Sequence, residues 1–124
     1  MFGWFKSKGK STPKPLYPES RWVVAVDDAD IRVRDDKGQE KSVPKAALSS
    51  VIIETNDSGP WGADVWWLLF ADDYALACSY PQGATGEDAA LGFLSSLADF
   101  DHGLMIKAMS STGNAAFPVW RRPV

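Results

Sequence analysis

The chain has 124 residues, of which 45% are hydrophobic and 23% are charged, and its formal net charge is −3. These values are typical of one folded domain and exclude a chain that is disordered throughout. Its one cysteine, Cys78, excludes an internal disulfide and a cysteine metal cluster, and the apolar neighbours of Cys78 favour a small buried residue. No run approaches the roughly 20 apolar residues of a membrane span, and no signal peptide is recognisable, so we expect a cytoplasmic protein.

Charge is distributed unevenly along the chain. Residues 1–15 contain four lysines and no acid, a charge of +4, whereas the remaining 109 residues contain nine bases and sixteen acids, a charge of −7. Because phosphate backbones are bound mainly through positive charge, we expect no nucleic-acid binding by this acidic body. We expect its partner to be another protein with a basic surface.

Residues 1–20 combine prolines, glycines and lysines without periodicity, which predicts a flexible basic and aromatic tail before a single domain over residues 21–124. Aromatic rings beside lysines can enter a membrane interface while the bases meet anionic headgroups. The candidate membrane-contact residues are Phe2, Trp4, Phe5, Lys6 and Lys8. The alternative is that the aromatic side chains pack back onto the domain.

From Arg21 onward the sequence is β-type, with short runs of β-branched and aromatic residues separated by polar turns. The first predicted strands are residues 22–26, 31–34, 39–43 and 51–55. Pro44 ends the third of these, which we expect at an edge. The acids between the first strands lack the spacing of an EF-hand, so hairpin-turn roles are favoured over calcium binding.

The most apolar segment, residues 65–70, predicts a central strand that forms a hairpin with residues 74–80. Thr85 is the expected N-cap of a helix whose apolar stripe extends to Phe100. Asp101 then caps a second, short helix. Residues 117–120 predict a last strand at an edge.

These elements predict an α+β fold: an antiparallel β-meander of about six strands, followed by one or two C-terminal helices and a short last strand. If the sheet curved until it nearly closed around the helix, it would resemble a pleckstrin-homology-like barrel. That likeness concerns the order of elements only and assigns no function.

The sequence offers little to catalysis. His102 is the only histidine, and one histidine with one cysteine leaves too few ligands for a transition-metal site. Residues 82–86 precede a helix as a phosphate-binding loop does, but they lack the lysine of that motif, and two acids follow. We therefore expect no cofactor and no metal, and an enzyme is disfavoured.

The loop between the fourth and fifth predicted strands is the strongest candidate binding site. It is too elaborate for a minimal hairpin, and loops on a rigid sheet often carry binding residues. The candidates are Glu54, Asn56, Asp57, Trp61 and Asp64. In the functional interpretation the tryptophan anchors a basic partner and the acids surround it. In the structural alternative, the polar side chains only cap the loop backbone.

Several short segments resemble motifs of a small, uncharacterised bacterial protein family, a domain of unknown function. They are IETNDSGP at 53–60, DVWW at 64–67, PQGATGE at 81–87, FD at 100–101 and AM at 108–109. The resemblance covers about residues 20–122 and implies a bacterial cytoplasmic protein. It carries over no catalytic residue.

Three hypotheses for the function follow. The first is a non-catalytic protein-interaction module that uses the acidic, tryptophan-containing loop. The second is a small enzyme or ligand-binding protein with a pocket beside residues 54–64, in which Glu54, Asp57, Asp64 or His102 is the acid or base. The third is association with a membrane surface through the tail.

Overall fold

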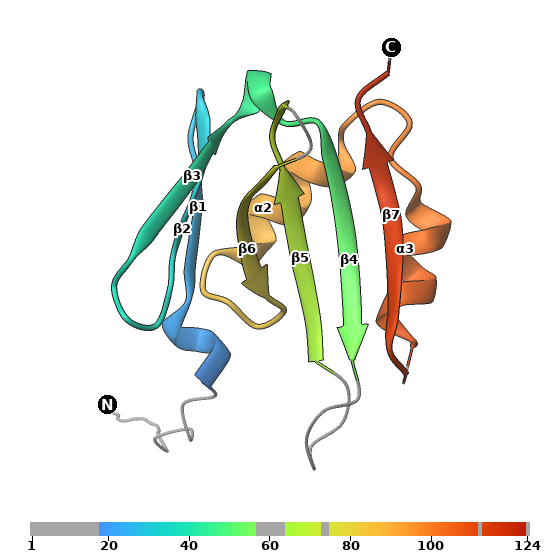
Figure 1. The fold of residues 1–124 in the computed structure, drawn as a ribbon, viewed down its shortest axis with the longest axis horizontal. Coiled ribbons are helices and arrows are strands. Elements are labelled where there is room, and N and C mark those ends of the chain that lie inside the picture. Colours follow the sequence, from blue (N-terminus) through green and yellow to red (C-terminus); the bar gives the residue numbers. More distant parts are fainter. Residues whose placement is uncertain (1–17, 57–63, 73–74, 112, 124) are drawn as a thin grey trace, which may run out of the picture.

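The computed structural model describes residues 18–56, 64–72, 75–111 and 113–123 (Figure 1). Its elements follow the predicted order of strands, helices and a final strand. They are η1 (Pro18–Arg21), β1 (Val23–Val26), β2 (Asp30–Arg34), β3 (Glu40–Pro44), η2 (Lys45–Ala47), β4 (Ser50–Asn56), β5 (Asp64–Phe70), β6 (Leu76–Pro81), α2 (Glu87–Ser95), α3 (His102–Met109) and β7 (Ala115–Arg121). The predicted α+β class is confirmed.

The seven described strands form two antiparallel sheets, ordered β1-β2-β3 and β6-β5-β4-β7. The meander divides after Pro44, where η2 carries the chain from the first sheet to the second (Figure 1). As predicted, β3 is an edge strand, β5 is central, and the last strand lies at an edge beside β4. Both sheets are open, so the nearly closed barrel is not the arrangement found.

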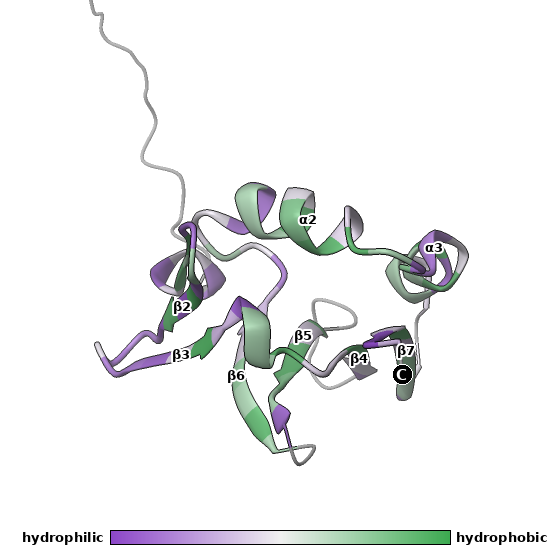
Figure 2. Ribbon diagram, turned by 90° about the horizontal axis from the view of Figure 1, so that it is seen from above, coloured by the Kyte–Doolittle hydropathy of each residue, from purple (hydrophilic) through white to green (hydrophobic). Residues whose placement is uncertain are grey.

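Both helices lie on the same side of the four-stranded sheet, which we call the inner face (Figure 2). Helix α2 packs against β1, whereas α3 packs against β7 and β4. In Figures 1 and 2, α2 lies over β6 and β5, and α3 lies over β7 at the opposite edge of the sheet.

The start of α2 differs from the prediction. Its N-cap is Gly86, with φ of 89°, and a Cβ there would lie 2.1 Å from the Val24 carbonyl oxygen, so the close approach to β1 requires glycine. Thr85 is held one residue earlier: its hydroxyl donates to the Ser20 carbonyl, at 2.8 Å. Glu87 caps the turn instead, because its carboxylate accepts from the Gly83 N–H, at 3.0 Å.

Helix α2 ends at Ser95, well before the predicted end at Phe100. Its C-cap is Ser96, and Asp99 has a left-handed φ of 68°, so the chain turns twice before α3 begins. The second predicted cap is confirmed, because Asp101 Oδ1 accepts from the Leu104 N–H at 2.9 Å.

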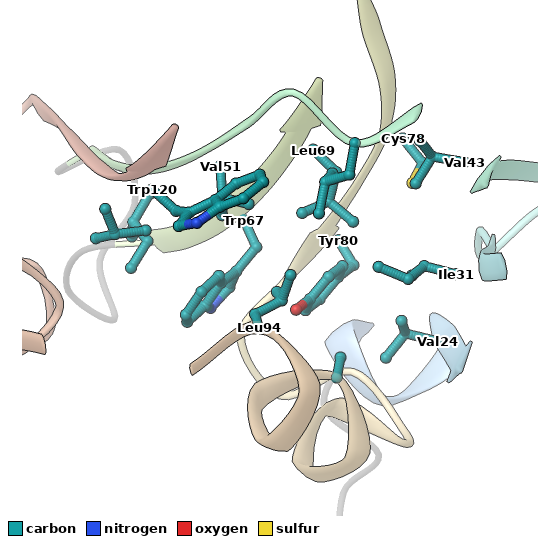
Figure 3. Packing of buried hydrophobic residues seen from close by; sticks show 14 of the residues in the cluster. Val24, Ile31, Val43, Val51, Trp67, Leu69, Cys78, Tyr80, Leu94 and Trp120 are labelled. Carbon is teal, nitrogen blue, oxygen red and sulfur yellow. The ribbon is translucent and has the colours of Figure 1, made fainter. Parts of the chain in front are cut away.

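The hydrophobic core lies between the inner faces of the sheets and the helices (Figure 3). Alternate residues of β2, β4 and β5 are buried in it, which is the period of two that a half-buried strand shows. Cys78 is among the buried residues, as predicted, and burial raises the pKa of its thiol to about 11.

Part of the predicted tail belongs to the described fold. Helix η1 begins at Pro18 and lies against the loop between β6 and α2, which Figure 1 shows at the same end of the molecule as the β4 and β5 termini. Among the described residues, no helix is long and apolar enough to cross a bilayer.

Candidate functional site

A cavity of about 290 Å³ lies between the β5–β6 hairpin and the two helices. The strands supply its floor, the loop after β6 and the first half of α2 supply one wall, and Met105 and Met109 of α3 supply the other. Its lining residues are Trp67, Tyr80, Gln82, Glu87, Asp88, Leu91, Met105 and Met109. We call this space the inter-helix cavity.

Two aromatic side chains form the floor. Trp67 and Tyr80 are cross-strand partners, and their rings stack with centroids 6.2 Å apart and planes 4° from parallel. Both side chains project from their strands toward the helices (Figure 3). Trp67 is 3% exposed and Tyr80 is 1% exposed, so stacking and burial fix this floor rigidly.

Both floor residues carry polar groups that the described protein does not satisfy. Neither the Trp67 indole N–H nor the Tyr80 hydroxyl makes a hydrogen bond within residues 18–56, 64–72, 75–111 and 113–123, whereas the Trp120 indole N–H donates to the Ala98 carbonyl at 2.8 Å. Buried tyrosine and tryptophan usually find a partner, because an unmade hydrogen bond costs about 1–3 kcal/mol. Two such groups at one cavity indicate a surface built to meet hydrogen-bond acceptors.

The Tyr80 hydroxyl stays protonated under all physiological conditions. Burial, and then the negative charge of Glu87, raise the pKa of Tyr80 well above its usual value. The group is therefore a neutral hydroxyl that can donate a hydrogen bond.

The rim of the cavity is acidic on one side. Glu87 and Asp88 belong to the first turn of α2, and no basic side chain lines the cavity in the part of the chain that the structure describes. Glu87 is half-buried and fixed by Gly83, whereas Asp88 is exposed. The rim therefore favours a positively charged group at the mouth.

The remainder of the rim is apolar. Leu91 and Met109 are each 38% exposed, and Met105 is half-buried beside them in the lining. Methionine side chains adapt readily to different apolar shapes, and exposed apolar groups at a concave site are typical of binding surfaces. The cavity can therefore receive an apolar side chain next to a cationic one.

Neither Glu54 nor Asn56, the predicted loop residues whose side chains the structure describes, lines this cavity. Glu54 pairs with Trp66 and is exposed, in the alternate set to the buried Ile53 and Thr55, so its side chain lies on the outer face of the sheet. Asn56 is half-buried at the end of β4. Asp64 begins β5, but its side chain lies outside the described residues.

Other predicted contact residues cannot be placed. Asp57 and Trp61 lie outside the described residues. So do the five membrane-contact candidates Phe2, Trp4, Phe5, Lys6 and Lys8.

The ends of the loop nevertheless lie next to the cavity. Gln82, which lines it, donates its backbone N–H to the Val65 carbonyl at 2.7 Å, one residue after Asp64. On the adjacent strand, β4, the buried Thr55 hydroxyl donates to the Gly113 carbonyl at 2.8 Å. Gly113 follows α3 in the chain. The end of β4 and the start of β5, which residues 57–63 connect in the sequence, therefore both lie near the cavity.

The other candidate chemistry lies elsewhere. His102 is exposed at the start of α3 and packs edge-on against Phe100, with centroids 5.0 Å apart. No group of three metal-ligating side chains occurs among the described residues. Asp27, in the turn after β1, stabilises that turn by accepting from the backbone N–H groups of Asp30 and Ala29. These hydrogen bonds, together with Arg32, lower the pKa of Asp27 to about 2.

Sequence reasoning missed the cavity because each lining residue has an ordinary structural explanation. Glu87 and Asp88 suit the first turn of any helix, and Leu91 and Met105 fit apolar stripes. The structure leaves three large apolar side chains of the two helices exposed, Leu91, Ile106 and Met109.

Comparisons of the chain with protein-family models, with curated proteins and with solved structures found no match. The resemblance to an uncharacterised bacterial family and the cytoplasmic location stay predictions.

Proposed function

We propose that this protein is a non-catalytic protein-interaction module whose inter-helix cavity binds a segment of a partner that carries a large apolar side chain beside lysine or arginine. The observation that supports it most strongly is the floor. Buried and stacked, Trp67 and Tyr80 present two unpartnered donors to a cavity with an acidic rim. Peptide backbone carbonyls are the acceptors that such donors fit.

Charge and shape support the same class of partner. The basic groups of the partner would meet Asp88 and the outer side of Glu87, and an apolar side chain would enter between Leu91 and Met109. Exposed ion pairs contribute only about 0.2–1 kcal/mol each, so they set specificity while apolar burial supplies most of the affinity. The acidic, tryptophan-containing loop over residues 54–64 remains part of this proposal as a second contact for the same partner.

A small-molecule ligand is the second candidate function. The volume of about 290 Å³ is near the lower limit of about 300 Å³ for ligand pockets, and the lining is mainly apolar with few polar groups. The acid or base that a catalytic version needs is not supplied by Glu54, on the outer face, or by His102, which does not line the cavity.

Selection of peptides from a random displayed library against the full chain tests the first proposal. We expect enrichment of sequences that pair an aromatic or large aliphatic residue with lysine or arginine. Their affinity should fall at least about tenfold in Leu91→Glu, because a charge enters the apolar wall, and about threefold in Asp88→Lys.

Matched variants far from the cavity provide the controls. Leu76→Glu changes another exposed leucine, at the start of β6, and Asp28→Lys reverses another exposed acid, in the turn after β1. Both should bind the selected peptides like the unmodified chain. Absence of enrichment, or equal losses in cavity and control variants, would contradict the proposal.

A further inference from the structure

The N-terminal segment enters the described structure beside the inter-helix cavity. A Cβ on Gly83 would lie 3.1 Å from Glu19 Cβ, and the Thr85 hydroxyl donates to the Ser20 carbonyl at 2.8 Å. Gly83 directly follows Gln82, which lines the cavity. Helix η1, to which residues 1–17 are joined, therefore packs against the loop that supplies part of one cavity wall.

The composition of this segment matches the ligand that the cavity selects. It holds four aromatic residues, at positions 2, 4, 5 and 17, and four lysines, without an acid. The cavity offers an apolar mouth and the carboxylates of Glu87 and Asp88, with no base among its described lining residues. Charge and apolar character are thus complementary in the same molecule.

The segment is also long enough to reach the mouth of the cavity. An extended chain covers about 3.3 Å per residue, so the thirteen residues from Phe5 to Tyr17 can span up to about 40 Å. An eight-residue helix such as α3 is only about 12 Å long. Every part of the cavity mouth lies within reach of the aromatic residues.

We infer that the chain's own N-terminal segment occupies the inter-helix cavity in cis, with an aromatic side chain among Phe2, Trp4 and Phe5 in the mouth and lysines against Asp88 and Glu87. This inference rests on the proposed peptide-binding function. Backbone carbonyls of the segment accept from the Trp67 indole and the Tyr80 hydroxyl. A partner must displace the segment, so the segment acts as a built-in competitor.

Competition within one chain has a measurable size. A short linker gives an effective concentration of about 1 mM, so a segment whose free peptide binds at about 100 µM weakens an external ligand about tenfold. Removing the aromatic side chains should restore the affinity for the external ligand by that factor.

The test compares the full chain with a variant that carries Phe2→Ala, Trp4→Ala and Phe5→Ala. The matched control carries Ser7→Ala, Ser11→Ala and Thr12→Ala. The probe is a labelled synthetic peptide of residues 1–15, and the readouts are its affinity and the ¹⁵N-resolved indole N–H signal of Trp67. Thermal unfolding shows whether both variants keep the fold.

We expect the aromatic variant to bind the probe about tenfold more tightly than the full chain or the control variant does. Its Trp67 indole signal should differ from that of the full chain and return on addition of the probe. Identical indole signals and equal affinities in all three chains would overturn the inference. So would a signal that depends on protein concentration, which would assign the segment to a second copy.

Two further outcomes separate the inference from the function on which it rests. If library-selected peptides bind the cavity while the residue 1–15 peptide does not, the proposed function stands and the inference fails. If the full chain binds vesicles of anionic lipid while the Trp67 signal is the same with and without the aromatic residues, the segment serves a membrane surface and the inference fails. If no peptide binds, both proposals fail.

Discussion

Strands β5 and β6 carry two neighbouring cross-strand pairs on the same inner face, and these pairs have different roles. Leu69 and Cys78 form one pair, and Trp67 and Tyr80 form the next. All four side chains are at most 3% exposed. Only the second pair borders the inter-helix cavity, and it carries an indole N–H and a hydroxyl without partners among the described residues.

The comparison shows that burial alone does not separate a structural residue from a binding residue. The Leu69 pair has apolar neighbours and a thiol that burial keeps protonated. The Trp67 pair is equally buried but retains unmet hydrogen-bonding capacity next to an open volume. Unsatisfied polar atoms, rather than exposure, therefore mark the candidate site.

The largest expected effect is on the apolar pair. Leu69→Ala removes a fully buried side chain and should lower the free energy of unfolding by about 3 kcal/mol, through lost transfer free energy and a new cavity. Urea denaturation followed by circular dichroism measures it. A loss below about 1 kcal/mol would show that this layer is not close-packed.

The next largest effect is expected at Thr55, whose buried hydroxyl has hydrogen-bond partners. Thr55 is 1% exposed, and its hydroxyl contacts the Gly113 carbonyl and the Ser111 hydroxyl at 2.8 and 3.1 Å. Thr55→Val should cost about 1–2 kcal/mol, because it leaves buried partners unpaired. If the same denaturation experiment shows no loss, these hydrogen bonds do not stabilise the fold.

The two pairs should also differ in alkaline solution. The folded thiol of Cys78 has a pKa of about 11 against 9.0 for an ordinary cysteine. As the pH rises, the thiol therefore ionises in the unfolded chain before it ionises in the folded chain. Its contribution to the free energy of unfolding is fully present below pH 9 and decreases between pH 9 and 11. Cys78→Ala should remove the part of this decrease that begins near pH 9, leaving the Tyr80 part, which begins near pH 10. Unchanged pH profiles would contradict the buried placement of Cys78.

The smallest expected effect is the most informative. Tyr80→Phe deletes a hydroxyl without a partner in the described protein, so the free energy of unfolding should change by less than about 0.5 kcal/mol or increase. Binding of selected peptides should nevertheless weaken several-fold. A loss of stability like that of Thr55→Val would show that the Tyr80 hydroxyl already serves the fold.

Much of the fold was predictable because periodicity and turn chemistry are local. The β5–β6 hairpin, the central position of β5 and the Asp101 cap are confirmed. The Thr85 cap was wrong, because Thr85 instead bonds residues 20 and 22, distant in the chain. The division into two sheets was likewise invisible, since pairing between strands is not local.

The candidate site was less predictable than the fold. Sequence reasoning favoured loop polarity and so selected Glu54, whose side chain lies on the outer face. The cavity instead depends on how far apart α2 and α3 pack, which no motif encodes. Its floor residues resemble ordinary core aromatics until their unpaired donors are seen in three dimensions.

The most direct test of the binding site is a nuclear magnetic resonance titration with a library-selected peptide, carried out on the ¹⁵N-labelled chain with Phe2→Ala, Trp4→Ala and Phe5→Ala, in which no aromatic side chain of residues 1–5 competes for the cavity. Trp67 and Trp120 provide signal and control, because only the Trp120 indole N–H already has an acceptor, the Ala98 carbonyl. We predict that the Trp67 indole signal moves downfield as the peptide saturates, while the Trp120 signal stays in place. Saturable binding that leaves the Trp67 signal unmoved would contradict the assignment of the inter-helix cavity as the binding site.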